Sequence, residues 1–254
     1  MGTFRWMGFA ALAAVMACND YSAVAPDPGP QATVFVASGN IAAEVDNFRN
    51  ALGPSNGGTA GEQPAGRREI SWDGAGANPF NNRNDFPAAF FNTNVKSGAV
   101  FTTAGTGFRN DSTTFNEINP NYGAEFTAFS PTKIFAPVGS NQLDQLFQVA
   151  GQPTPAVVNG FGIVLSDVDL ADKTTIELFA QDGSRLGTYA APVRSDAAGL
   201  SFIGVMYAEA IIARVRITLG TGALGANVND ISAGGTLDLV VLDNLVYGEP
   251  RKAF

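Results

Sequence analysis

The sequence contains no histidine and only one cysteine among its 254 residues. Without histidine, Ser-His-Asp and Cys-His catalytic pairs, imidazole general bases and His-containing zinc, copper or iron sites are all excluded. The lone cysteine, Cys18, cannot form an intramolecular disulfide. Any chemistry of this chain therefore depends on carboxylates, hydroxyls, amides, lysine and arginine.

Charged residues are also scarce, and the balance among them is acidic. They make up 15% of the chain, with 23 Asp and Glu against 15 Lys and Arg, for a formal net charge of -8. An acidic surface repels phosphates, and the sequence has no basic stripe, so no nucleic-acid partner is expected. Nucleotide-binding loops and the common hydrolase motifs are absent as well. The 29 glycines, 14 prolines and 19 phenylalanines instead favour strands and tight turns around a hydrophobic core.

The amino terminus has the pattern of an export signal. Arg5 precedes an apolar run over residues 6–17 that is too short for a typical membrane span. The run ends in Val15, Met16, Ala17 and Cys18, which resembles the lipobox of bacterial lipoproteins. We therefore expect a signal peptide over 1–17, a lipidated Cys18 and a flexible spacer over 18–31, which would anchor the protein in the bacterial cell envelope. The alternative is an ordinary signal peptide and a secreted, soluble protein.

One amphipathic helix is predicted over residues 41–52. Its apolar positions recur at helical spacing: Ile41, Val45, Phe48 and Leu52. Asn40 is suited to cap its start, and Gly53 followed by Pro54 to end it. Residues 54–66 are rich in glycine and polar residues and are expected to form a mobile loop.

After Arg67 the pattern changes to strands and turns. Residues 174–179 and 185–189 predict a hairpin around Asp182 and Gly183, which are suited to positive φ angles. Apolar and polar residues alternate over 211–219, as in a sandwich strand. Further strands are predicted at 67–72, 98–103, 132–136, 143–149, 157–168, 201–207 and 237–247. Together they favour a mainly β fold: a single jelly-roll-like antiparallel β-sandwich domain over residues 32–254 that includes the helix.

Two acidic segments are candidate metal sites. Asp167 and Asp169 are two residues apart, so they share a face if the strand continues through them, and Asp172 follows in the next turn. Asp243 interrupts an otherwise apolar run. Oxygen ligands of this kind favour calcium. The alternatives are a polar strand end for Asp167 and Asp169, and backbone hydrogen bonds for a buried Asp243.

A third segment, residues 71–87, is a candidate glycan-binding surface. It combines an aromatic ring with amides and carboxylates, which can stack on a sugar and bind its hydroxyls: Trp72, Asp73, Asn78, Asn81, Asn82, Asn84 and Asp85. The alternative is a core position for Trp72, with the asparagines satisfying turns.

A series of segments resembles a group of uncharacterised exported bacterial proteins, some of which end in a PEP-CTERM sorting signal. The segments are SWDG, FFNTN, GTGF, GFGIVLSDVD, TTIELFAQDGSRLGTY, GLSFIGV, ARVRITLG and LDNLVYGEP. The resemblance implies a secreted jelly-roll-type sandwich without an established activity, so it assigns no functional residue. The carboxy-terminal GEPRKAF lacks the sorting signal, and an amino-terminal lipid would replace it.

These observations favour a surface-anchored, non-catalytic binding or matrix module, with calcium and an extracellular glycan or envelope component as its expected ligands. Two alternatives remain open. One is a carbohydrate-active hydrolase that uses two carboxylates, and the other is a purely structural envelope protein.

Overall fold

The structure is a computed structural model that describes residues 1–2, 29–73, 79–196 and 198–253. Its larger sheet contains β1 Ala32–Ser38, β2 Arg67–Ile70, β4 Gly107–Asp111, β5 Ile134–Val138, β8 Gly160–Ser166, β11 Leu200–Tyr207 and β13 Val241–Gly248. The smaller sheet contains β3 Ala99–Thr102, β6 Gln142–Phe147, β9 Thr175–Phe179, β10 Arg185–Ala190 and β12 Arg214–Thr218. The remaining elements are the strand pair β7 Ala156–Val157 and β14 Arg251–Lys252, and the helices α1 Ala42–Leu52, α2 Phe90–Thr93 and α3 Tyr122–Glu125.

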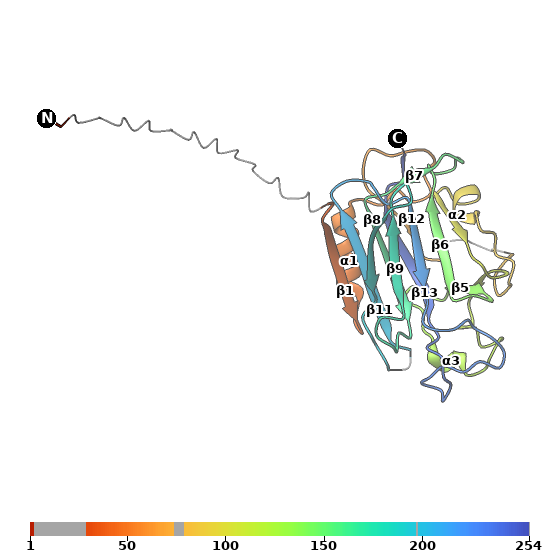
Figure 1. The fold of residues 1–254 in the computed structure, drawn as a ribbon. Helices are drawn as coiled ribbons and strands as arrows, with labels where there is room; N and C mark the ends of the chain where they lie inside the picture. Colours follow the sequence, from red (N-terminus) through yellow and green to blue (C-terminus); the bar gives the residue numbers. More distant parts are fainter. Residues whose placement is uncertain (3–28, 74–78, 197, 254) are drawn as a thin grey trace.

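The two larger sheets pack face to face, which confirms the expected mainly β sandwich (Figure 1). The larger has the strand order β1-β11-β8-β13-β5-β4, with β2 also on β13, and the smaller the order β10-β9-β12-β6-β3. Pairing between the named strands is antiparallel. Apart from the β9–β10 hairpin, the chain changes sheet at each step from β8 to β13, as in a jelly roll.

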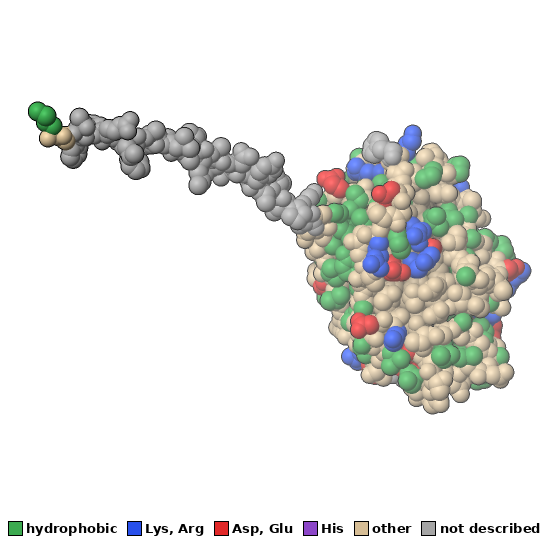
Figure 2. Space-filling view, viewed as in Figure 1, with side chains coloured by type: hydrophobic (Ala, Val, Ile, Leu, Met, Phe, Trp, Pro, Cys, Tyr) green, Lys and Arg blue, Asp and Glu red, His purple; other side chains and the backbone are tan. Residues whose placement is uncertain are grey.

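Alternating side chains build the core between the sheets. In β12, Val215 and Ile217 are buried, whereas Arg214 and Arg216 lie on the outer face, where both pair with Asp144. This is the alternation that the sequence predicts. Figure 2 shows basic and acidic side chains gathered together near the middle of the visible face, among largely uncharged surroundings.

The predicted hairpin is also confirmed, with a correction to its turn. Strands β9 and β10 are antiparallel neighbours, and Gly183 has a φ of 84°. Asp182 is not among the residues with positive φ, and its carboxylate instead accepts a hydrogen bond from the Ser184 N–H at 2.9 Å. One glycine therefore supplies the left-handed position, and the aspartate supports the turn through its side chain.

Helix α1 covers the outer face of the larger sheet. Phe48 packs against Phe35 and Phe202 with ring centroids 5.2 and 5.7 Å away. Gly162 and Gly204 are cross-strand partners beneath its ring, where a Cβ atom would come within 2.6 and 2.9 Å of ring atoms. The helix and this sheet enclose a second apolar cluster, which explains why every residue of β8 is buried.

The ends of α1 confirm one prediction and correct another. Gly53 ends the helix, with a φ of 102° and its N–H bonded to the Arg49 carbonyl. At the start, the capping position is Ile41 rather than Asn40, and no side chain caps it. Docking of the apolar face therefore stabilises this helix more than a cap does.

Three named strands were not predicted: β1, β4 and the two-residue β14. Strand β1 precedes α1 and pairs with β11 along its whole length. It lies at the edge of its sheet, where Val34 and Val36 stay exposed, so the sequence lacks a clear two-residue alternation there. Strand β4 carries buried polar residues, which conceals its strand character in the sequence.

The loop over residues 54–66, which we expected to be mobile, is tied to the sandwich by a buried ion pair. The guanidinium of Arg68 binds both carboxylate oxygens of Glu249 at 2.6 Å. It also donates hydrogen bonds to the carbonyls of Gly57, Thr59 and Gly61. The backbone of this loop thus has specific partners in the core.

The expected lipidation site, Cys18, lies outside the described residues, as do most of the expected signal peptide and Asn78. Among the described residues, no helix is long and apolar enough to cross a membrane.

Candidate metal centre

The carboxylate of Asp167 is buried without a hydrogen-bond partner. The residue follows the end of β8, is 0% exposed, and has a φ of 71°. Its backbone N–H donates to the Gly199 carbonyl, but neither carboxylate oxygen has a partner among the described residues. A buried polar group normally has a partner, because leaving it unpaired costs stability.

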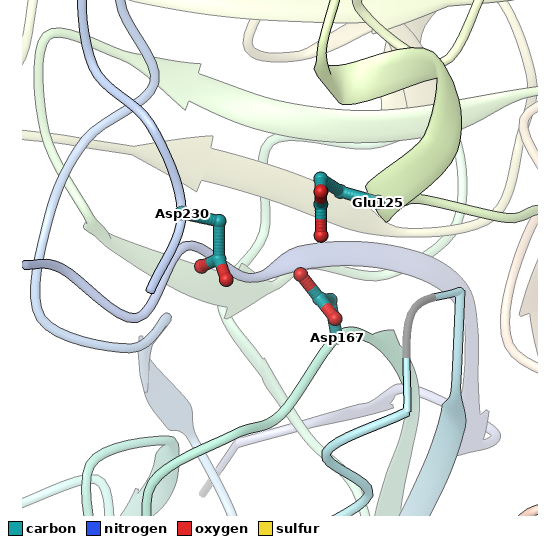
Figure 3. Close-up of side chains that lie close together, drawn as sticks. All are labelled: Glu125, Asp167 and Asp230. Atoms are coloured by element: carbon teal, nitrogen blue, oxygen red, sulfur yellow. The ribbon is translucent and has the colours of Figure 1, made fainter. Parts of the chain in front are cut away.

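Figure 3 shows what the Asp167 side chain faces. Its carboxylate points toward those of Glu125, at the end of α3, and Asp230, in the long segment between β12 and β13. One oxygen from each of the three residues lies within 4.8 Å of the others. Asp230 also belongs to a second such group with Asp169 and Asp238. We call these five residues the acidic cluster.

Backbone hydrogen bonds fix the carboxylates contributed by the long segment. Asp230 accepts bonds from the Ser232 and Leu239 N–H groups, both at 2.7 Å. Asp238 accepts bonds from the N–H groups of Asp169 and Leu170 at 3.3 and 3.1 Å. These contacts join the segment to the chain that follows β8, and they hold the carboxylates in place.

The electrostatics of the acidic cluster are unfavourable to carboxylates alone. Burial, followed by the charges of Asp230 and Asp169, raises the pKa of Asp167 to about 9. Burial and the adjacent Asp230 raise the pKa of Asp169 to about 6, and burial also raises the pKa of Asp238. Within the described part of the chain, none of the ion pairs involves a member of the cluster.

This donor set fits a hard divalent cation. Calcium takes oxygen ligands at about 2.3–2.6 Å, so ligands on opposite sides of one ion are about 5 Å apart. The 4.8 Å limit within each group fits inside such a coordination sphere. Magnesium usually keeps several waters and seldom uses an all-protein cage. The groups contain no nitrogen or sulfur ligand, which disfavours zinc and copper.

The structure thus brings Asp167 and Asp169 into one cluster, although not in the way that we expected. Strand β8 ends at Ser166, and the left-handed backbone at Asp167 breaks the alternation, so the two residues do not share a strand face. Asp167 belongs to one ligand group and Asp169 to the other. Asp172 is exposed and is a member of neither group.

Asp243, the other expected metal ligand, has hydrogen-bond partners within the protein. Its strand β13 does pair with β8, but Asp243 belongs to neither ligand group. Its carboxylate accepts hydrogen bonds from the N–H groups of Phe129 and Ser130 and from the Ser130 hydroxyl. Burial raises its pKa to about 7, against the effect of these donors. The alternative of backbone hydrogen bonding is the one that the structure has.

Trp72 is a core residue, so it cannot provide an exposed platform for a sugar ring. It is 1% exposed and stacks on Phe135 with a centroid distance of 3.9 Å. Its indole N–H donates to the Asp243 carbonyl at 2.7 Å. Asp73 is occupied as well, because its carboxylate accepts a hydrogen bond from the Thr132 hydroxyl at 2.9 Å.

Most of the remaining candidate glycan residues make contacts within their own region of the fold. Asn82 accepts a hydrogen bond from the Ser112 N–H, and the Asn84 side-chain oxygen accepts one from Arg109. Asp85 pairs with Arg83 on the surface. Asn81 forms a β-bridge with Asn110, and its side-chain oxygen is buried without a partner. This segment supports strand β4 instead of presenting an aromatic surface.

Three members of the acidic cluster were not predicted: Glu125, Asp230 and Asp238. They lie far from Asp167 in the sequence, in segments without a recognisable ligand spacing. Only their burial marks them, since all three are buried in the folded chain.

Comparison of the chain with protein-family models, with curated proteins and with solved structures finds no match.

Proposed function

We propose that this protein is an exported, surface-anchored, non-catalytic binding or matrix module whose β-sandwich binds calcium at the acidic cluster. The observation that carries the calcium proposal is the Asp167 carboxylate, which is fully buried, lacks a hydrogen-bond partner and faces Glu125 and Asp230. A cation is the partner that removes both the burial cost and the repulsion among these groups.

Calcium at this position would join three separate parts of the chain. They are the end of α3, the segment after β8, and the long segment between β12 and β13. An ion that binds only the folded chain stabilises it by mass action. Extracellular modules use calcium sites with dissociation constants of about 10⁻⁴–10⁻³ M. A site of this kind agrees with the export signal in the sequence.

The alternative function, a carbohydrate-active hydrolase, has less support than the calcium-binding module. Asp73 and Asp243 lie on either side of the Ser130 hydroxyl, which is 2.7 and 3.0 Å from their oxygens. Asp243 is 0% exposed, however, and backbone donors already occupy its carboxylate. A catalytic acid must reach the glycosidic oxygen of the substrate, which the buried Asp243 does not.

Glycan binding has less support as well, because Trp72 is buried and provides no aromatic platform for a sugar. We therefore retain only calcium as the ligand in the proposal.

Thermal unfolding of the full chain tests the calcium proposal. We expect the melting temperature to rise progressively from chelator to millimolar calcium, and to rise less with magnesium at equal ionic strength. At 100 times the dissociation constant, one bound ion adds about 2.7 kcal/mol. For a domain of this size, that corresponds to a shift of roughly 5–10 °C. An unchanged melting temperature across the calcium series would reject the proposal.

A further inference from the structure

The acidic cluster contains two ligand groups that meet at one residue. Glu125, Asp167 and Asp230 form the first group, and Asp169, Asp230 and Asp238 form the second. In each group the ligand oxygens lie within 4.8 Å of one another. The three oxygens of each group are therefore close enough together to bind one ion.

Each group also has an oxygen that the protein leaves unpaired. In the first group, both oxygens of the fully buried Asp167 lack a partner. In the second, the same holds for Oδ1 of Asp169, an atom that is itself buried. Asp167 and Asp169 flank Val168 in the sequence, and each shares a ligand group with Asp230.

The hydrogen bonds of Asp230 suit it to bridge two ions. Its Oδ1 accepts the Ser232 N–H, and its Oδ2 accepts the Leu239 N–H. A carboxylate oxygen has about two acceptor positions, so each oxygen keeps one for a cation. The Ser232 hydroxyl lies near both Asp230 and Glu125, and its single proton can be donated to Glu125.

The charge of the acidic cluster also favours two ions over one. When ionised, the five carboxylates of the cluster carry five negative charges, and within the described chain no Lys or Arg forms an ion pair with them. One divalent cation neutralises two of these charges, whereas two cations neutralise four. A second ion therefore removes most of the repulsion that one ion would leave.

We infer that the acidic cluster binds two calcium ions, one in each ligand group, with Asp230 as their shared ligand. This inference rests on the proposed function, because it concerns the same cluster. It adds the number of ions and the role of each carboxylate. Glu125 and Asp167 serve the first ion, Asp169 and Asp238 serve the second, and Asp230 serves both.

Native mass spectrometry of the full chain in calcium tests the number of ions. We expect two calcium ions per chain in the wild type, and one in Glu125→Gln and in Asp169→Asn, which each alter a single group. The double variant Glu125→Gln/Asp169→Asn should bind no calcium at the same concentration, and neither should Asp230→Asn. Glu209→Gln is the matched control, because this exposed carboxylate lies outside the cluster, and it should keep two ions.

The outcomes separate the two proposals. No ion in the wild type overturns both of them. One ion in the wild type, lost in Glu125→Gln and kept in Asp169→Asn, overturns the second site and leaves the proposed calcium function intact. Two ions in a folded Asp230→Asn variant overturn the shared ligand. If circular dichroism shows that Asp230→Asn does not fold, the wild type and the two single-group variants decide the number of ions.

Discussion

Replacing Asp167 with asparagine should have opposite effects with and without calcium. The side chain is 0% exposed and unpaired, and asparagine has nearly the same shape without the charge. Asparagine also tolerates the left-handed backbone at this position, where φ is 71°. In chelator the substitution should therefore stabilise the protein, and in calcium it should weaken the response to the ion.

The size of the effect follows from the burial of the carboxylate. An asparagine amide at this position is also buried and unpaired, so the substitution removes only the cost of the carboxyl charge or of its proton. The pKa of Asp167 is raised from 3.8 to about 9, so at pH 7 the calcium-free protein keeps this group protonated. Keeping that proton at pH 7 costs about 4 kcal/mol at most. We therefore expect Asp167→Asn to raise the free energy of unfolding in chelator by up to about 4 kcal/mol.

Urea unfolding at pH 7, followed by the fluorescence of the buried Trp72, measures this effect in chelator and in millimolar calcium. The wild type should gain stability from calcium and the variant should gain little. The difference between their free energies of unfolding should therefore shrink in calcium, or change sign. Glu209→Gln, an exposed carboxylate-to-amide change, should follow the wild type in both conditions. A variant that is less stable than the wild type in chelator would refute the reasoning, because it would mean that the Asp167 carboxylate has a partner in the ion-free protein.

Three further predictions concern the helix, a buried carboxylate and the amino terminus. Phe48→Ala should lower the free energy of unfolding by about 3–5 kcal/mol, because it empties the space over Gly162 and Gly204. Val36→Ala, at a side chain that is 52% exposed, should change the urea midpoint little, and equal midpoints for the two variants would contradict the docking of α1. Burial raises the pKa of Asp243 from 3.8 to about 7, so the folded state holds a proton that the unfolded state releases, and stability falls as the pH rises from about 4 to about 7. Asp243→Asn should therefore be most destabilising, relative to the wild type, near pH 4, and the difference should shrink by up to about 4 kcal/mol toward pH 7 in parallel urea titrations; a difference that does not change with pH would argue against this titration. Cys18→Ser should move the protein from the membrane fraction to the soluble fraction, and an unlipidated wild-type amino terminus in intact-mass measurement would contradict the lipoprotein prediction.

Local patterns in the sequence determined the elements that depend on near neighbours. The spacing of Val45, Phe48 and Leu52 predicts α1, and the structure buries all three. The alternation around Val215 and Ile217 predicts β12, and the turn at Gly183 predicts the β9–β10 hairpin. These predictions hold because helix and strand periodicity and turn geometry are set over a few residues. The acidic segment at Asp167 and Asp169 was also found from local spacing, although the strand that this spacing implied ends at Ser166.

Tertiary structure alone decided which side chains are buried and which carboxylates meet. Trp72 and Asp243 each had a surface or ligand role and a core role open to them, and packing between the sheets and against Phe129 and Ser130 selected the core role. The acidic cluster combines Asp167 with Glu125 and Asp230, which distant segments contribute. Such contacts depend on how strands and loops pack across the sandwich, and residue spacing carries no record of them. The same packing places the carboxylates close together away from water, and the calcium proposal rests on this arrangement.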